Sequence, residues 1–553
     1  MIGPAARSPS RLAAPAIGNR AIAGRSWSRP GRLSAQPLAA QRSDRAAARA
    51  APAAINGSPT KPSPDAGAHT DTAAAASPSA YPWLQQWYPV AVAADLPTDR
   101  PHPFTLFGRQ LVLWRDAAGA WRCFQDACPH RLAPLSEGRV VEGQLVCSYH
   151  GWSFEGTGKC TRVPQAMDER SEAAACGSRR ACAATQPTAE AAGLVWVWPD
   201  ASPGAPEQAA AAPLPVHPDL LAGGAGGGAT PGSGSFVNIG GGWLVRECPY
   251  GFDTMIENIL DPGHVMWAPH GLLGRREDAV PYAVKLQGEI SLEGGFATSL
   301  GASSRKLEVQ RRSLEFRPPC FVRQTIAPGE LGPGPTGWLP PCHAPSKGSS
   351  LVTCGYAVPS RPGHCLLVTT SYAEAGSGAG GLRAALGLVP RWLLHVYTQE
   401  VLDGDLILLH GQERRLEKAG GSWRSAFFMP TPSDGAVVAF RRWFDDMAGG
   451  VGGLPWAGGG GLPPEEESKE KLLDRLHQHT QHCPSCSAAL ARARTGQRAG
   501  LGLAAAATAA AAWLPGTPPA LSAAVALGGV ALAGLASWVE PLFVFKDYFH
   551  AER

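Results

Sequence analysis

The amino-acid sequence predicts an α+β protein with a small antiparallel β domain, a larger mixed α/β domain and a C-terminal helical hairpin. Three observations lead to this prediction. Residues 81–203 alternate apolar and polar positions in short runs, which is typical of antiparallel strands. Residues 235–465 mix strand-like runs with longer helical segments. Residues 499–539 are almost uncharged, which predicts helices that are buried in protein or in a membrane.

The individual elements follow from these patterns in chain order. Strands are predicted at residues 104–108, 110–114, 193–199, 320–325 and 364–369, and helices at 253–261 and 393–409. A charged stretch at 465–476 predicts a solvated helix, and the glycine-rich tract at 449–461 predicts a loop. Two low-complexity stretches predict a surface insertion at 172–192 and a flexible linker at 204–234.

The β domain contains a C-x-H motif at residues 128–130 and a C-x-x-H motif at residues 147–150. Together they offer two thiolates and two imidazoles: Cys128, His130, Cys147 and His150. This set is typical of a Rieske [2Fe–2S] centre, in which two histidines replace two cysteines on one iron. A structural zinc site is the alternative, but zinc sites usually pair C-x-x-C with H-x-x-x-H, whereas each motif here holds one cysteine and one histidine.

A second metal site is predicted around residues 257–270, which read ENILDPGHVMWAPH. Two histidines and one carboxylate bind non-haem Fe(II) and leave coordination positions open for O₂. His264 and His270 are the candidate imidazoles, with a plain loop histidine as the alternative for His270. Asp261 stands one helical turn before His264, so both side chains are expected on one face.

The carboxylate ligand must come from further along the chain, and residues 402–413 are the best window. A lone acid before an apolar run usually caps a helix, but this window holds two acids. Asp405 is preferred as the third iron ligand over Asp403, and Glu400 is a weaker third choice.

Cys483 and Cys486 form a C-x-x-C between a charged segment and a basic one. Its position predicts solvent-accessible thiols beside the apolar helices. Such a pair is either a redox disulfide with a lowered thiol pKa or half of a zinc site. Since no second C-x-x-C exists, zinc would need further ligands, for which His477, His479 and His482 are the neighbours considered.

The apolar C-terminus divides at Pro515–Pro519 into residues 499–514 and 520–539. A bilayer span needs about 20 apolar residues, so the second segment is long enough and the first is marginal. Basic residues flank both outer ends, namely Arg492, Arg494, Arg498 and Lys546. This predicts a membrane anchor of one or two helices with both ends on one side. A buried hairpin in a soluble protein is the alternative.

Residues 1–75 are rich in Ala, Ser, Pro and Arg, and the first acidic residue is Asp44. With no apolar signal core, this composition predicts an organellar transit peptide, and a disordered tail is the alternative. The net charge of the 553-residue chain is only +4, which argues against nucleic acid as a partner. An odd total of 13 cysteines does not resemble a secreted disulfide scaffold.

The segments around these motifs resemble the plant and algal pheophorbide a oxygenase group of Rieske monooxygenases, which includes the inner-envelope-translocon Rieske protein. WYPV at 87–90, LWRD at 113–116 and CTRVPQA at 160–166 carry the resemblance, which runs from about Tyr81 to the C-terminus. It implies a Rieske domain at 81–203, a helix-grip-like catalytic domain at 235–465, a redox segment at 466–498 and a membrane anchor at 499–539.

The resemblance also implies roles and partners. Asp261 would not bind iron but would link the iron histidine to a cluster histidine of a neighbouring subunit in a homotrimer. Reduced ferredoxin would supply electrons, and the C-x-x-C would be a redox pair with thioredoxin as a candidate reductant. The protein would lie at a chloroplast membrane, inner envelope or thylakoid, with its catalytic domains in the stroma. One departure stands out: family members commonly have histidine where this chain has Pro269, one place before His270.

The implied activity is a ferredoxin-dependent Rieske non-haem iron monooxygenase that uses O₂ to oxygenate a chlorophyll-derived tetrapyrrole. Ring opening of pheophorbide a is the first hypothesis. Hydroxylation of another chlorophyll catabolite or of protochlorophyllide is the alternative within the enzyme class. A non-catalytic, import-associated electron carrier with a redox-sensing role is the alternative outside it, and it would hold two irons per chain rather than three.

Overall fold

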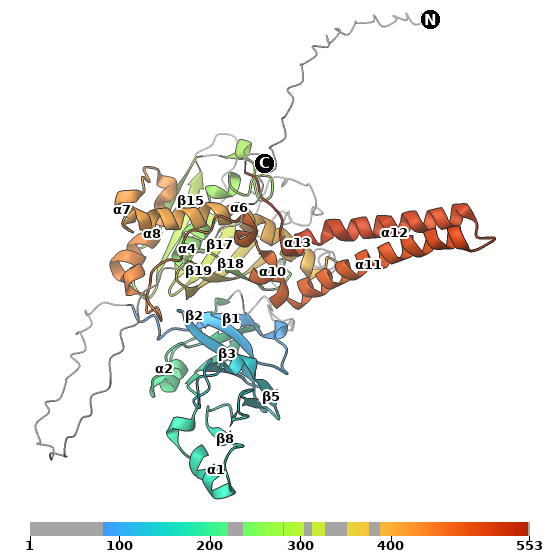
Figure 1. Cartoon of the computed structure of the whole chain (residues 1–553). Coiled ribbons are helices and arrows are strands. Elements are labelled where there is room, and N and C mark those ends of the chain that lie inside the picture. The colour runs from blue at the N-terminus through green and yellow to red at the C-terminus, as the bar shows by residue number, and fades with distance from the viewer. Residues whose placement is uncertain are drawn as a thin grey trace, which may run out of the picture. The chain divides into compact units, whose positions relative to one another are not determined.

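The computed structural model describes residues 81–218, 220, 236–239, 241–279, 281–302, 312–326, 351–374 and 388–550 (Figure 1). The predicted transit peptide and most of the predicted linker lie outside these residues. Within them, the chain forms antiparallel sheets first, then a larger sheet with helices, and finally a helical hairpin. The predicted α+β class is therefore confirmed.

The N-terminal part contains three antiparallel sheets. The first has the order β1 (Tyr88–Val92), β11 (Leu194–Val197), β10 (Thr188–Ala191). The second has the order β2 (His102–Leu106), β3 (Arg109–Arg115), β4 (Trp121–Gln125), β9 (Thr185–Gln186). The third runs β5 (Arg139–Val141), β6 (Gln144–Val146), β7 (Ser153–Phe154), β8 (Cys160–Arg162). The two cysteine motifs follow β4 and β6.

The low-complexity stretches are more ordered than predicted. Residues 172–192 contain the end of α1 (Glu169–Cys176) and both β9 and β10, which pair with β4 and β11. The segment therefore completes two sheets, and the prediction of a surface insertion is wrong. Its alanine-rich composition resembles low complexity, but alanines such as Ala181 and Ala183 are buried core residues. The predicted linker likewise opens with a helix, α2 (Ala205–Ala211).

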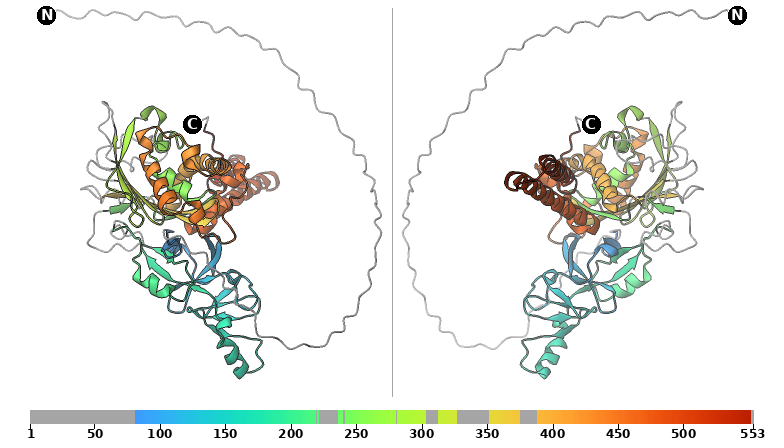
Figure 2. Two further views of the ribbon diagram at one scale, coloured as in Figure 1. Left: turned by 90° about the vertical axis from the view of Figure 1, so that its left-hand side faces the viewer. Right: turned by 90° about the vertical axis from the view of Figure 1, so that its right-hand side faces the viewer.

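The larger part is built on an eight-stranded antiparallel sheet with the order β12-β19-β18-β17-β16-β15-β14, and β13 also pairs with β19. The strands are β12 (Phe236–Asn238), β13 (Leu244–Cys248), β14 (Tyr282–Leu286), β15 (Phe296–Ala302), β16 (Arg312–Arg317), β17 (Phe321–Ile326), β18 (Leu351–Arg361) and β19 (His364–Glu374). The sheet curves around helices that lie on one of its faces (Figure 2). These helices are α4 (Phe252–Leu260), α6 (Arg391–Lys418), α7 (Trp423–Ala426) and α8 (Gly435–Arg441).

Helix α4 packs against the middle of this sheet because most of its side chains are apolar and buried. The acidic side chains of α4 form ion pairs with α8, where the Arg441 guanidinium donates to Asp253 at 3.0 Å and also to Glu257. Removal of either partner of such a buried ion pair would leave an uncompensated charge in the core, which is strongly destabilising. The pairing fixes the first turns of α4, and the C-terminal end of the helix leads to Asp261 and His264.

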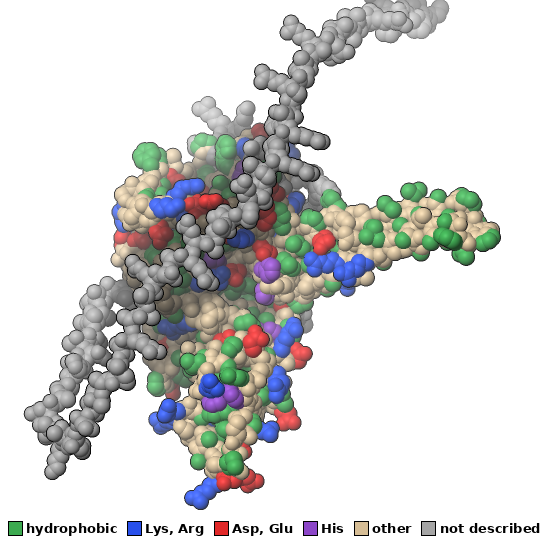
Figure 3. All heavy atoms as spheres, in the orientation of Figure 1, with side chains coloured by type: hydrophobic (Ala, Val, Ile, Leu, Met, Phe, Trp, Pro, Cys, Tyr) green, Lys and Arg blue, Asp and Glu red, His purple; other side chains and the backbone are tan. Residues whose placement is uncertain are grey.

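The chain ends in an antiparallel helical hairpin of α11 (Pro484–Trp513) and α12 (Pro519–Val539), which lie side by side (Figures 1 and 2). The backbones touch at two glycines, since a Cβ on Gly500 would stand 2.5 Å from the Gly529 carbonyl oxygen. Hydrophobic side chains lie exposed along the hairpin, with Lys and Arg gathered near its base (Figure 3). In the described chain, one helix is long and apolar enough to cross a membrane, at Pro519–Val544 with mean hydropathy 1.9.

Candidate metal centres

The two cysteine motifs form loops with the same backbone design. In each loop the cysteine carbonyl accepts from the backbone N–H four residues on, Leu132 in the first and Gly151 in the second. Both of these residues have a positive φ, 58° and 73°. Leu132 is an unusual residue for that conformation, which indicates that the tight loop is required here.

These loops place the four predicted cluster ligands together. The Cys128 and Cys147 thiols are buried and adjacent, whereas His130 is exposed and His150 half-buried. The imidazole centroids of His130 and His150 lie 4.6 Å apart, and the indole of Trp152 stacks on His130 at 4.7 Å. Buried thiols with imidazoles at the surface suit a cluster whose outer iron faces an electron partner.

His264 stands in a short 3₁₀ turn, His264–Met266, just beyond α4. Its Nε2 lies 3.7 Å from Oδ2 of Asp405, and its Nδ1 lies 3.9 Å from Oδ2 of Asp261. Nδ1 of His264 and Oδ1 of Asp405 are both buried without a hydrogen-bond partner among the described residues. Burial raises the pKa of the Asp405 carboxyl to about 6, against the opposing influence of His264. The facing atoms, Nε2 of His264 and Oδ2 of Asp405, are an imidazole nitrogen and a carboxylate oxygen, which suit two ligands of one metal ion.

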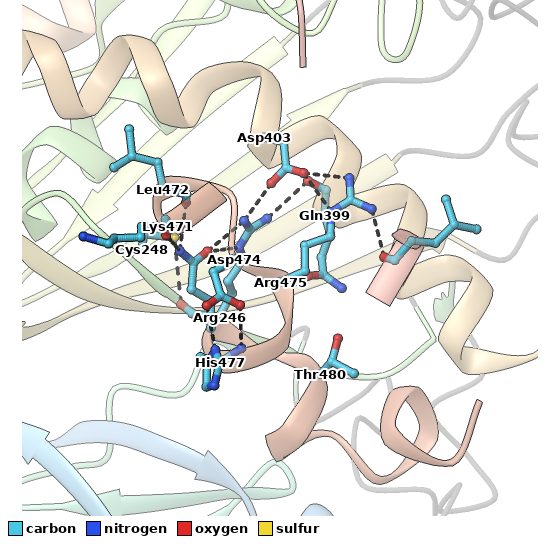
Figure 4. Close-up of polar contacts among 12 residues, drawn as sticks. Arg246, Cys248, Gln399, Asp403, Lys471, Leu472, Asp474, Arg475, His477 and Thr480 are labelled. Carbon is cyan, nitrogen blue, oxygen red and sulfur yellow. Dashed lines mark hydrogen bonds and ion pairs between the residues drawn. The ribbon is translucent and has the colours of Figure 1, made fainter. Parts of the chain in front are cut away.

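The two aspartates of α6 have different surroundings. Asp403 is fully buried between two arginines, with Oδ1 2.6 Å from Arg246 Nη2 and Oδ2 2.6 Å from Arg475 Nη2 (Figure 4). The Arg246 guanidinium also donates to the Gln399 carbonyl at 3.2 Å. Asp403 is therefore neutralised by two cations, while Asp405 turns toward His264. Glu400, the third candidate, is paired with Lys546 at 2.5 Å.

The structure does not bring His270 into the same arrangement. Its Nδ1 accepts a hydrogen bond from the Arg276 backbone N–H at 3.1 Å. A neutral imidazole whose Nδ1 accepts carries its proton on Nε2, which then has no lone pair for a metal. The ligand atoms of His264, His270 and Asp405 do not gather as one close metal-binding group among the described residues.

A different histidine, His550, approaches the iron site from the C-terminal segment. Its Nε2 donates at 2.7 Å to the carbonyl of Gly404, the residue that precedes Asp405. The same segment is held over residues 268–276 by Tyr548, whose hydroxyl donates to the Ala268 carbonyl at 2.8 Å. His550 cannot be identified from the sequence, because nothing in the spacing of two residues so far apart relates it to Asp405.

The C-x-x-C thiols are buried, so the prediction of solvent accessibility is wrong. Cys483 is 3% exposed and Cys486 is fully buried. The charged segment before them is not one solvated helix but two short ones, α9 (Lys469–Leu472) and α10 (Arg475–Gln478), whose apolar and arginine side chains enter the core. The chain therefore folds back over the thiols at this point. Both thiols contact the histidines His395 and His479.

Comparisons with known proteins agree with these two predicted centres. The Rieske [2Fe-2S] domain family matches residues 86–173, and the pheophorbide a oxygenase family matches residues 316–423. The chain is 35% identical to the chloroplastic pheophorbide a oxygenase of Oryza sativa subsp. japonica over 500 residues, which cover 87% of this chain and 88% of that protein. It is 32% identical to flavonoid 8-hydroxylase 2 of Ocimum basilicum over 85% of this chain and 86% of that protein.

Among solved structures, dicamba monooxygenase bound to dicamba is similar, with 19% identity, a TM-score of 0.48, and 66% of this chain and 97% of that chain covered. The 35% identity to the pheophorbide a oxygenase of Oryza sativa over 87% of this chain, together with both family matches, assigns the family. This chain belongs to the pheophorbide a oxygenase family and is a Rieske non-haem iron monooxygenase, whose cofactors are a [2Fe–2S] cluster and a mononuclear iron.

Proposed function

We propose that this enzyme oxygenates a chlorophyll-derived tetrapyrrole and that its reaction is the ring opening of pheophorbide a. The observation that carries the proposal is the 35% identity to pheophorbide a oxygenase across both metal-binding regions. A relative of similar identity is named a flavonoid hydroxylase, so membership of the family leaves the substrate open. Both substrate classes are flat, largely apolar ring systems, and both require activated O₂.

The ligand assignment is part of this proposal. Cys128, His130, Cys147 and His150 would hold the cluster, because their loops bring buried thiols and surface imidazoles together. His264 and Asp405 would hold the mononuclear iron, which supplies O₂ activation when bound. The fold keeps the carboxylate of Asp405 buried and directs Nε2 of His264 toward that carboxylate.

Asp261 is proposed as the electron link between subunits of a homotrimer. Its side chain is 39% exposed, and Oδ2 faces His264 while Oδ1 accepts from the Gly263 N–H at 2.8 Å. A carboxylate that orients the non-ligating nitrogen of a metal-binding histidine is a common arrangement. The exposed part of the Asp261 carboxylate would contact a cluster histidine of the neighbouring subunit, since the imidazoles of His130 and His150 are at least partly exposed. Reduced ferredoxin is the proposed electron donor.

We also propose a chloroplast location, with the hairpin as anchor in the inner envelope or thylakoid and the two metal domains in the stroma. Chloroplastic relatives support the organelle. The apolar surface of α12, where Leu521, Leu527, Leu535 and Trp538 are all more than half exposed, supports the anchor. Exposed leucines in such numbers on one helix are unusual in water.

The substrate is tested by incubating the reconstituted, full-length protein with reduced ferredoxin, O₂ and a set of candidates. The set contains pheophorbide a, a second chlorophyll catabolite, protochlorophyllide and a flavone. We expect a linear, oxygenated product from pheophorbide a, seen as loss of its long-wavelength absorption and a mass gain from oxygen. Turnover of the flavone alone would contradict the proposal. No turnover with three irons per chain would also contradict it, whereas no turnover with only two irons per chain would favour the electron carrier.

The sequence and the structure favour different histidines as the second imidazole ligand of the iron site. Sequence order favours His270, whereas the hydrogen bond of His550 to the carbonyl of Gly404, the residue before Asp405, favours His550. On the contacts, His550→Ala should lose most of the mononuclear iron, and His270→Ala should keep it, both with an unchanged Rieske spectrum. Metal analysis of the purified variants checks this. Iron loss in His270→Ala alone would restore the ligand assignment that sequence order gives.

A further inference from the structure

Four metal-binding side chains from three segments meet at the base of the helical hairpin. His395 lies in the first turns of α6, His479 follows α10, and Cys483 and Cys486 open α11. All four are buried, with exposed fractions of 0%, 2%, 3% and 0%. Their ligand atoms all lie within 4.8 Å of one another. Neither the proposed cluster nor the proposed iron site uses any of them.

The distances between these atoms match the edges of a tetrahedron around one ion. With Zn–N about 2.0–2.1 Å and Zn–S about 2.3 Å, a tetrahedral zinc requires N–N edges of about 3.3 Å and N–S edges of about 3.6 Å. Nδ1 of His395 lies 3.2 Å from Nε2 of His479. The nitrogen–sulfur distances are 3.5 and 3.7 Å from His395 to Cys483 and Cys486, and 3.4 Å from His479 to Cys486.

Ordinary hydrogen bonds explain this convergence less well than a shared ion. Nδ1 of His395 has three neighbours within 3.7 Å, His479, Cys483 and Cys486, but a single N–H can serve one of them well. Nδ1 of His479 donates to the Val245 carbonyl at 2.6 Å, and a carbonyl can only accept. That bond leaves a lone pair on Nε2 of His479, pointing at the group, which is the usual arrangement of a metal-binding histidine.

Without an ion, Arg391, His395 and His479 form a chain of hydrogen bonds. Nε of Arg391 donates to Nε2 of His395 at 3.4 Å, so Nδ1 of His395 carries the proton. Metal binding would move that proton to Nε2 and release one from each thiol. The contact given up is long, and Arg391 stays held by Asp95 at 2.6 and 2.7 Å and by the Trp243 carbonyl at 2.9 Å.

We propose that His395, His479, Cys483 and Cys486 bind a structural zinc ion. Two thiolates and two imidazoles are a typical zinc set, and four protein ligands leave no open position for chemistry. The inference goes beyond the proposed function, since it does not depend on which substrate the enzyme takes. It also replaces the redox role predicted for the C-x-x-C, because a buried, metal-bound pair is not open to thioredoxin.

The ion would connect the hairpin to α6, the helix that carries Asp405. His395 and Asp405 are ten residues apart on α6, which corresponds to about 15 Å of rise. Cys483 and Cys486 open α11, the first helix of the hairpin, and the same core includes Val396 of α6 and Phe543 after α12. The zinc would thus fix the direction in which the hairpin leaves the catalytic domain.

The first test measures zinc in the purified full-length protein and its coordination by X-ray absorption. We expect one zinc per chain, beyond the iron, with two sulfur and two nitrogen neighbours. His479→Ala should lose it, whereas the exposed neighbours His477 and His482 provide matched controls whose alanine variants should keep it. Wild-type protein that holds no zinc after incubation with zinc and a thiol reductant would overturn the proposal, and this readout needs no variant to fold.

The second test asks what the thiols do. In the native protein, Cys483 and Cys486 should resist alkylation until a chelator is added, and exposed Cys182 should react at once. In Cys483→Ser/Cys486→Ser, protease should cut residues 479–486 at least about tenfold faster, because cleavage follows the population of locally opened chain. An oxidant-dependent disulfide that forms in wild type despite excess zinc, and that thioredoxin reverses, would overturn the metal site and establish the redox pair.

Discussion

Asp403→Ala should be the most destabilising single change in the catalytic domain, lowering the unfolding free energy by about 3–5 kcal/mol. The carboxylate lies at 0% exposure between Arg246 and Arg475, both also buried, and its removal leaves two uncompensated guanidinium charges. For a domain of this size the loss corresponds to a fall in melting temperature on the order of 10 °C. Thermal unfolding of the detergent-solubilised protein measures it.

Asp405→Asn is the matched control, two residues along the same helix. Burial raises the pKa of Asp405 to about 6 from 3.8, so folding disfavours its charged form. The penalty grows as pH rises from about 4 through 6, and an amide removes it. We therefore expect Asp405→Asn to lose mononuclear iron, and to melt at the same or a higher temperature than wild type when both are compared without iron. Equal melting temperatures for Asp403→Ala and wild type would show that the arginine pair does not need this carboxylate.

His264→Ala should reduce turnover to the level without enzyme while the Rieske spectrum stays intact. The imidazole faces both the carboxylate of Asp405 and that of Asp261, at 3.7 and 3.9 Å. Without it, the mononuclear metal loses a ligand and the proposed electron link loses its end point. Iron should fall from three to two per chain, and the reduced cluster should keep an EPR signal with average g below 2.

Asp261→Asn separates electron transfer from metal binding. Asp261 is not a proposed ligand, so this variant should retain its mononuclear iron. Its turnover should nevertheless fall by about 10–100-fold, as is usual when a group that orients a metal ligand is lost. Re-oxidation of the reduced cluster in a single turnover, followed by absorbance, measures the step directly. Re-oxidation at the wild-type rate would exclude the bridging role.

The sequence by itself determined the fold class, the cluster motifs and the family. The C-x-H and C-x-x-H motifs are short, and each loop holds its own two ligands, so the pattern is visible along the chain. Periodicity also predicts β17 and α4 to within one residue of their observed ends, and it predicts the starts of β19 and α6, both of which extend further than expected. Local signals of this kind are available before folding.

Tertiary structure alone decided which distant side chains meet. Asp403 and Asp405 look alike in sequence, yet the helix turns one toward two arginines and the other toward His264. Cys483 and Cys486 have charged neighbours along the chain, but the folding of α10 and α6 over them buries both beside His395. Contacts between residues more than 70 positions apart depend on packing, and residue spacing in the sequence does not indicate them.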